Sequence, residues 1–92
     1  MNKKKFVLNG SNIQTLENFY DEVNRVLCPG FDGFGRNLNA LVDILRGGFT
    51  VFEFGEEIIV EWQHFNRSGD FKYKQDVLEI FSDAENVELL KS

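Results

Sequence analysis

The chain has 92 residues, of which 42% are apolar, 14% aromatic and 27% charged. Disordered chains lack this much core-forming material, and a chain this short leaves no room for a second domain, so we predict one small globular domain over residues 1–92. No segment approaches the ~20 consecutive apolar residues that span a bilayer, so we expect no membrane partner. The single cysteine, Cys28, cannot form an internal disulfide, which favours a reducing compartment and a cytoplasmic location.

The charge balance is acidic. The formal net charge is -5 and the sequence pI is about 4.8. This opposes a nucleic-acid binder, which normally has a basic face that neutralises phosphates. Residues 3–5 hold three of the six lysines, so the 87 residues from 6 to 92 have a formal charge of -8. An acidic body of this kind favours a basic partner, although acidity also serves solubility alone.

In the first half of the chain, the apolar run at 6–8 predicts a short buried strand, too apolar for an exposed edge. Apolar residues spaced three and four apart over 16–27 predict an amphipathic helix, which must end before Pro29. A loop rich in glycine and phenylalanine follows at 29–36. Asn37 can cap a second helix, whose apolar stripe runs to residue 45 and ends at two glycines.

In the second half, residues 49–62 allow two interpretations. One is a β-hairpin over 49–62; the other is a single central strand at 57–62, preceded by an extended connection and buried on both faces. A short helical turn is predicted at 63–66, a helix with its stripe at 77–84, and a last strand at 87–90. The order strand, helices, strand, helix, strand is an α/β pattern that favours a small parallel sheet with helical crossovers.

Catalysis is poorly supported. The only histidine, His64, has no spaced partner that suggests a triad or a metal site, so a packing or surface role is expected, and we predict no metal and no cofactor. Cys28 resembles a small buried hydrophobe more than a nucleophile. The loop at 29–36 joins two helices, unlike a phosphate-binding loop, and is either a tight connection or a protein-recognition loop.

Residues 34–43, Phe-Gly-Arg-Asn-Leu-Asn-Ala-Leu-Val-Asp, resemble the signature of the barstar family, intracellular inhibitors of the secreted ribonuclease barnase. Residues 60–65 are similar to the second strand and turn of the family, and residues 77–81 to its last helix, so the resemblance covers nearly the whole chain. It implies a three-stranded parallel sheet flanked by helices. It also implies an inhibitor whose second helix and preceding loop occupy a ribonuclease active site, where carboxylate replaces RNA phosphate.

Carried over position by position, the resemblance implies that Asp43 is the principal carboxylate and that Asp83, on the last helix, is a second acidic contact. Phe34 matches the aromatic signature position, where it serves core packing. The full set of partner-binding positions implied is Gly33, Gly35, Arg36, Asn37, Leu38, Asn39, Val42, Asp43, Ile80 and Asp83. We expect the free protein to be a monomer, with a barnase-like ribonuclease or related toxin as its partner.

Three departures from the family pattern bear on the partner. Asn39 replaces an aspartate and Arg36 adds a cation, so the charges over residues 31–46 sum to zero and predict weaker, less salt-dependent binding to a basic site. The stretch at 53–57 is longer than the family pattern and forms either an extra hairpin or a partner-facing loop. The changed charges at Arg36 and Asn39 favour an alternative, a barstar-fold module that binds a different protein or toxin. An enzyme that uses Asp43 and Asp83 lacks a nucleophile and a placed base.

Overall fold

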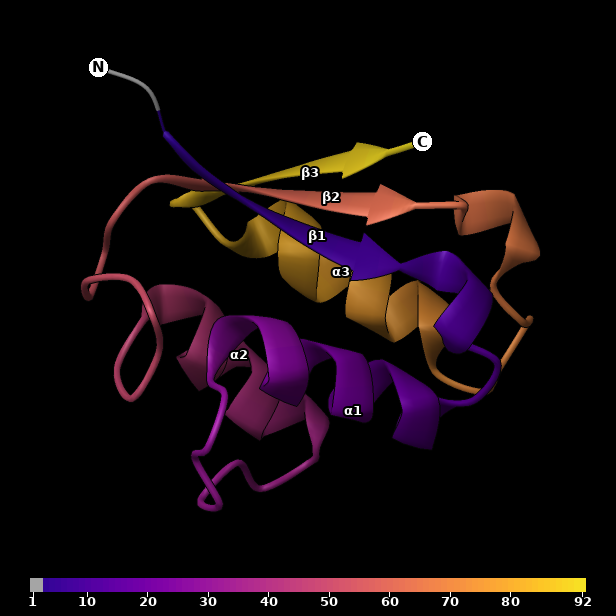
Figure 1. Ribbon diagram of the computed structural model, residues 1–92, viewed down its shortest axis with the longest axis horizontal. Helices are drawn as coiled ribbons and strands as arrows, with labels where there is room; N and C mark the ends of the chain where they lie inside the picture. Colours follow the sequence, from indigo (N-terminus) through magenta and orange to yellow (C-terminus); the bar gives the residue numbers. More distant parts are fainter. Residues whose placement is uncertain (1–2) are drawn as a thin grey trace.

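The computed structural model describes residues 3–92 (Figure 1). Met1 and Asn2, which begin the predicted domain, lie outside the described residues. The strands are β1 (Lys4–Asn9), β2 (Ile58–Gln63) and β3 (Val87–Lys91), the helices are α1 (Leu16–Leu27), α2 (Leu38–Arg46) and α3 (Lys74–Asp83), and the 3-10 turns cover Gly10–Asn12 and Phe65–Arg67.

The sheet is parallel in the order β1-β2-β3, and the three helices lie on one of its faces (Figure 1). Helix α1 packs against β1, α3 packs against β3, and α2 lies beside α3. Connections between parallel strands are almost always right-handed crossovers, and both crossovers here lead to the next strand in the same direction across the sheet. Their helices therefore lie on the same face of the sheet. The predicted α/β class with a three-stranded parallel sheet flanked by helices is confirmed.

The first two helices begin and end where the sequence predicts. Thr15 caps α1 by accepting a hydrogen bond from the N–H of Asn18 at 3.0 Å, and the helix ends before Pro29. Asn37 caps α2 in the same way, and α2 ends at Gly47. Both caps satisfy a backbone donor that has no partner inside the helix.

The core lies between the helices and the sheet. Its largest fully buried side chains include Trp62 on the central strand and Phe19 on α1, whose rings stack with centroids 5.5 Å apart. Burial of aromatic rings contributes much of the stabilisation of so small a domain. Leu41, Ile44 and Leu45 of α2 belong to this core, so packing of its inner face fixes α2 against the rest of the domain.

The hairpin interpretation of residues 49–62 is wrong, and the alternative, a single central strand, is confirmed. Residues 47–57 form an irregular connection, here called the α2–β2 connection, and only β2 is a strand. β2 pairs with β1 on one side and β3 on the other, so neither edge of it remains for a hairpin partner. The backbone also has positive φ at Gly47, Gly48 and Phe49, which is incompatible with extended pairing.

The expectation that the run at 6–8 is too apolar for an edge is also wrong, because β1 is an edge strand. Leu8 is fully buried beneath the helices, but its neighbour Val7 points to the opposite, open face of the sheet and is 37% exposed. Alternation of side chains lets a strand with one covered face lie at an edge. Lys4 and Lys5 at its start are the kind of residue that discourages pairing with another chain.

Candidate partner-binding site

Helix α2 is held in place at both ends by asparagine side chains. At its N-terminus, Asn37 Oδ1 accepts a hydrogen bond from the N–H of Ala40 at 2.8 Å, and Asn37 Nδ2 donates to the carbonyl of Gly35 at 3.2 Å. At its C-terminus, Asn86 Nδ2 donates to the carbonyl of Leu45 at 2.8 Å. These bonds satisfy groups that a helix end otherwise leaves to water. The helix therefore presents its outer face as a preformed surface.

Asn39 and Asp43 lie one turn apart on that outer face, and both are exposed. Across residues 3–92, no lysine, arginine or histidine forms an ion pair with Asp43. A cation from another molecule can therefore bind this carboxylate without displacing an internal partner.

Two hollows flank the C-terminal half of α2, and Arg46 and Phe54 line both of them. We call the larger, of 770 Å³, the acidic hollow; besides those two residues, its walls include Val42, Glu57, Ile80, Asp83 and Glu85. We call the smaller, of 350 Å³, the aromatic hollow; besides the shared pair, its walls include Phe31, Gly33, Phe34, Gly35, Asp43 and Phe49.

The structure thus divides the site residues predicted from the sequence. Val42, Ile80 and Asp83 meet in the acidic hollow, although they come from two different helices. Gly33, Gly35 and Asp43 meet in the aromatic hollow, and the remaining four predicted residues line neither; these are Arg36, Asn37, Leu38 and Asn39. Leu38 is half-buried and packs against the core.

The acidic hollow carries three carboxylates and one guanidinium, from Glu57, Asp83, Glu85 and Arg46. Its apolar walls come from Val42 and Ile80. This hollow suits a long basic side chain, because its apolar walls can contact the apolar stem and its excess of carboxylates can pair with the charged head.

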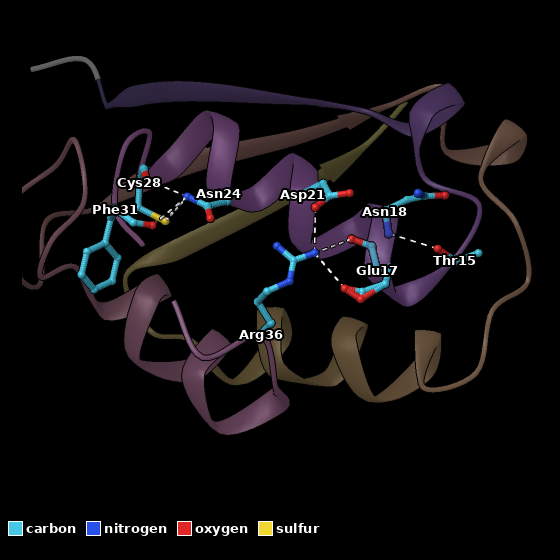
Figure 2. A network of polar contacts seen from close by, with 8 residues as sticks. All are labelled: Thr15, Glu17, Asn18, Asp21, Asn24, Cys28, Phe31 and Arg36. Carbon is cyan, nitrogen blue, oxygen red and sulfur yellow. Dashed lines mark hydrogen bonds and ion pairs between the residues drawn. The ribbon is translucent and has the colours of Figure 1, made fainter. Parts of the chain in front are cut away.

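Arg36 is paired inside the molecule (Figure 2). Its Nη2 lies 2.7 Å from Asp21 Oδ1 and 3.0 Å from Glu17 Oε1, both on α1. The hydrogen bond with Asp21, followed by that with Glu17, raises the pKa of Arg36 above its usual value. The zero net charge expected over residues 31–46 includes Arg36 as a free cation. Two carboxylates of α1 neutralise Arg36 and leave an excess negative charge beside the loop.

The loop before α2 rests on α1 through further contacts. Asn24 Nδ2 donates to the carbonyls of Cys28, at 2.8 Å, and Phe31, at 3.3 Å (Figure 2). Tyr20 packs edge-on against Phe34, with ring centroids 5.5 Å apart. These contacts hold residues 28–36 against α1 and make the loop an ordered surface.

The α2–β2 connection is ordered in a similar way. The N–H of Gly55 donates to the carbonyl of Arg46 at 2.6 Å, and the N–H of Val51 donates to the carbonyl of Leu27 at 2.9 Å. Gly47 is required here, because it has a φ of 88° and a Cβ at this position would lie 2.6 Å from the carbonyl oxygen of Glu53. Phe52 is buried and packs against the ring of Phe6.

Sequence reasoning missed Arg46, which lines both hollows, and did not single out Phe54 within the stretch at 53–57. It gave no role to Phe49 or Glu85, and it considered Phe31 only as part of the loop at 29–36. One signal was present. Residues 49–54 alternate as a strand would, yet they pair with no neighbouring strand, and part of the apolar side chains of such a segment is left at the surface.

The residues considered for catalysis occupy structural or peripheral positions. Cys28 is 1% exposed, and burial, the larger effect, raises the pKa of its thiol despite a hydrogen bond from Asn24. His64 is exposed in the turn after β2. Within residues 3–92, no cluster of side chains suits a metal ion, and no helix is long and apolar enough to cross a membrane.

The chain matches the sequence profile of a protein family over most of its length. No individual curated protein is significantly similar to the chain. The sequence profile of the family described as Barstar (barnase inhibitor) matches residues 3–89. The match covers β1, β2, all three helices, both hollows and β3 as far as Leu89. The members of this family are inhibitors, not enzymes. The parallel sheet, the capped second helix and this match together place the chain in the barstar family.

Proposed function

We propose that this protein inhibits a barnase-like ribonuclease by placing α2 and the loop before it over the nuclease active site. The observation that carries the proposal is Asp43, an exposed carboxylate on a capped helix, for which no internal cation is recorded in residues 3–92. A ribonuclease active site holds arginine, lysine and histidine to bind phosphate, and a rigid carboxylate competes for the same groups.

The surroundings of Asp43 support the proposal electrostatically. The acidic hollow lies beside it, and Glu17 and Asp21 of α1 lie beyond the loop. An excess of negative charge over this surface attracts a cationic partner over a distance set by the salt concentration. The barnase–barstar pair is itself a standard example of such steering and of a dominant carboxylate, so for Asp43 we predict an effect and a rank, and no magnitude.

We further propose that the protein acts as an immunity protein in the cytoplasm, where it protects a cell that makes and secretes the nuclease. The alternative, a different protein partner, was favoured by the changed charges at Arg36 and Asn39. Arg36 is neutralised by α1, so Asn39 alone still favours that alternative.

The test is an RNA-cleavage assay with barnase, and with any small secreted nuclease encoded beside the gene, in the presence of an equimolar amount of this protein. We expect the wild type to block cleavage and Asp43→Asn to block it less. Asp70→Asn is the matched control, because it removes the same charge from an exposed loop away from both hollows. Undiminished cleavage with excess wild-type protein contradicts the proposal, as does an equal loss of inhibition in both variants.

A further inference from the structure

Three large apolar side chains of the α2–β2 connection are exposed. Phe49 is 79% exposed, Phe54 is 77% exposed and Val51 is 47% exposed. Single exposed apolar side chains are common, but two exposed phenylalanines on the walls of one hollow form a patch. Patches of this kind mark sites where another molecule binds.

The aromatic hollow is well formed. The rings of Phe31 and Phe49 stack nearly in parallel, with centroids 4.7 Å apart and an interplanar angle of 7°. Phe54 and Phe34 also line this hollow, and the side chain of Phe34 is buried. Its volume of 350 Å³ lies at the lower end of the range for binding pockets, roughly 300–1,000 Å³.

Phe49 adopts a backbone conformation that a bulky residue rarely takes. Its φ is 63°, in the left-handed region, where glycine and asparagine are the favoured residues. The side chain is largely exposed and so contributes little to the core. A residue that strains the backbone without being buried is better explained by contact with another molecule.

The chemistry of the walls identifies the occupant. The aromatic hollow has one carboxylate, from Asp43, and one guanidinium, from Arg46, against three exposed or half-exposed phenyl rings. The acidic hollow beyond Phe54 has an excess of negative charge. A basic side chain is therefore better placed in the acidic hollow, and an apolar one in the aromatic hollow.

We propose that the aromatic hollow receives an apolar side chain of the partner ribonuclease, next to the cations that Asp43 binds. This rests on the proposed function, which it extends: the partner then has an exposed apolar residue beside its cationic active site. The hollow is continuous with the proposed interface, because Asp43 lines it. Buried aromatic contacts near the centre of an interface contribute strongly to affinity, whereas peripheral charges mainly increase the rate of association.

The first test needs no partner protein. ¹H–¹⁵N spectra of the full chain are recorded with N-acetylphenylalaninamide and, separately, with N-acetylargininamide. We expect the phenylalanine probe to bind with a Kd on the order of 1 mM and to shift the amide signals of the hollow, Gly33, Gly35, Gly47 and Gly48. Phe49→Asn, which suits a positive φ, and Phe54→Ser should abolish the shifts. Val51→Ser, on the same connection but outside the hollow, should retain them.

Three results of this titration overturn the proposal. They are no localised shift with the phenylalanine probe, larger shifts in the hollow with the arginine probe, and concentration-dependent shifts of the hollow without any probe. The last result identifies a second copy of this chain as the occupant.

The second test measures binding kinetics with barnase. We expect Phe54→Ser to dissociate roughly tenfold faster than the wild type, with its association rate and salt dependence unchanged. Val51→Ser should behave as the wild type. Wild-type protein that does not inhibit barnase contradicts the proposed function, and the probe titration still decides what the hollow binds. If the wild type inhibits barnase but Phe49→Asn and Phe54→Ser dissociate from barnase at the wild-type rate, only the proposed role of the aromatic hollow is contradicted.

Discussion

The guanidinium of Arg36 lies 2.7 Å from the carboxylate of Asp21, and this ion pair ties the loop before α2 to α1. Arg36 also contacts Glu17 and has a φ of 52°, so it holds the loop in a conformation that costs a non-glycine residue free energy. The pairing changes the charge of the candidate partner-binding surface, because the cation is neutralised by two acids that together carry one more charge than it does.

Arg36→Ala should therefore lower the free energy of unfolding by roughly 1 kcal/mol, since partly exposed ion pairs contribute little. Arg36→Gly should be less destabilising than Arg36→Ala, because glycine relieves the positive φ while the ion pairs are lost in both. Urea unfolding of the two variants measures this. A glycine variant that unfolds at lower urea than the alanine variant contradicts the expected strain.

Glu22 gives the fold a defined acid dependence. Its carboxylate is buried, accepts the N–H of Asn9 at 2.7 Å and pairs with Arg25 at 2.9 Å. Burial is the largest influence and raises the pKa of Glu22, but the hydrogen bonds from Arg25 and Asn9 together outweigh it, and the pKa is below its usual value.

A carboxyl whose pKa is lowered by folding stabilises the protein fully above its unfolded pKa of about 4.3, and the stabilisation is lost as the pH falls through the folded pKa. Glu22→Gln should lower the free energy of unfolding at pH 7 by about 1–3 kcal/mol, with a smaller difference from the wild type at pH 3. Urea unfolding at the two pH values tests this. A difference that is equal at both pH values shows that the charge of Glu22 is not responsible.

Variants of the two N-cap residues distinguish an effect on stability from an effect on partner binding. Asn37→Ala and Thr15→Ala should each lower the free energy of unfolding by about 1 kcal/mol, because each removes one N-cap. Asn37 also holds Gly35 beside the aromatic hollow, whereas Thr15 lies at the far end of α1 (Figures 1 and 2). In the RNA-cleavage assay Asn37→Ala should weaken inhibition more than Thr15→Ala. Equal inhibition by both would show that the cap serves stability alone.

Tyr20 is 3% exposed, and within residues 3–92 no protein group forms a hydrogen bond with its hydroxyl. Burial, the largest influence, raises the pKa of this phenol. Tyr20→Phe removes the unpartnered oxygen while keeping the ring against Phe34, so it should leave the free energy of unfolding unchanged or raise it by up to about 1 kcal/mol. Thermal unfolding tests this, and a clear loss of stability would reveal a hydrogen bond to bound water.

The elements specified by local sequence were predicted well. The spacing of apolar residues over 16–27 and the capping residue Asn37 depend only on neighbours in the chain, and α1 and α2 occur where these signals place them. The errors concern contacts between distant segments. Whether residues 49–54 pair as a hairpin depends on β1 and β3, which occupy both edges of β2.

For the candidate site as well, the residues carried by local motifs were predicted and the contacts between distant segments were not. Asp43 and Asp83 were predicted by resemblance, and the structure places them in neighbouring hollows on the two sides of α2. The shared wall could not be predicted, because Phe54 reaches α2 only through the left-handed turns at 47–49. The ion pairs of the Arg36 side chain could not be predicted from the sequence either, since its partners lie 15 and 19 residues earlier in the chain.

The central claim is that Asp43 replaces RNA phosphate in a cationic nuclease site. Its most direct test is a binding titration of barnase, or of a small secreted nuclease encoded beside the gene, with Asp43→Ala and Asp83→Ala, which replace two exposed acids on neighbouring helices. We expect both variants to bind more weakly than the wild type and Asp43→Ala to lose more affinity than Asp83→Ala. Wild-type affinity in Asp43→Ala would contradict the proposed role of Asp43.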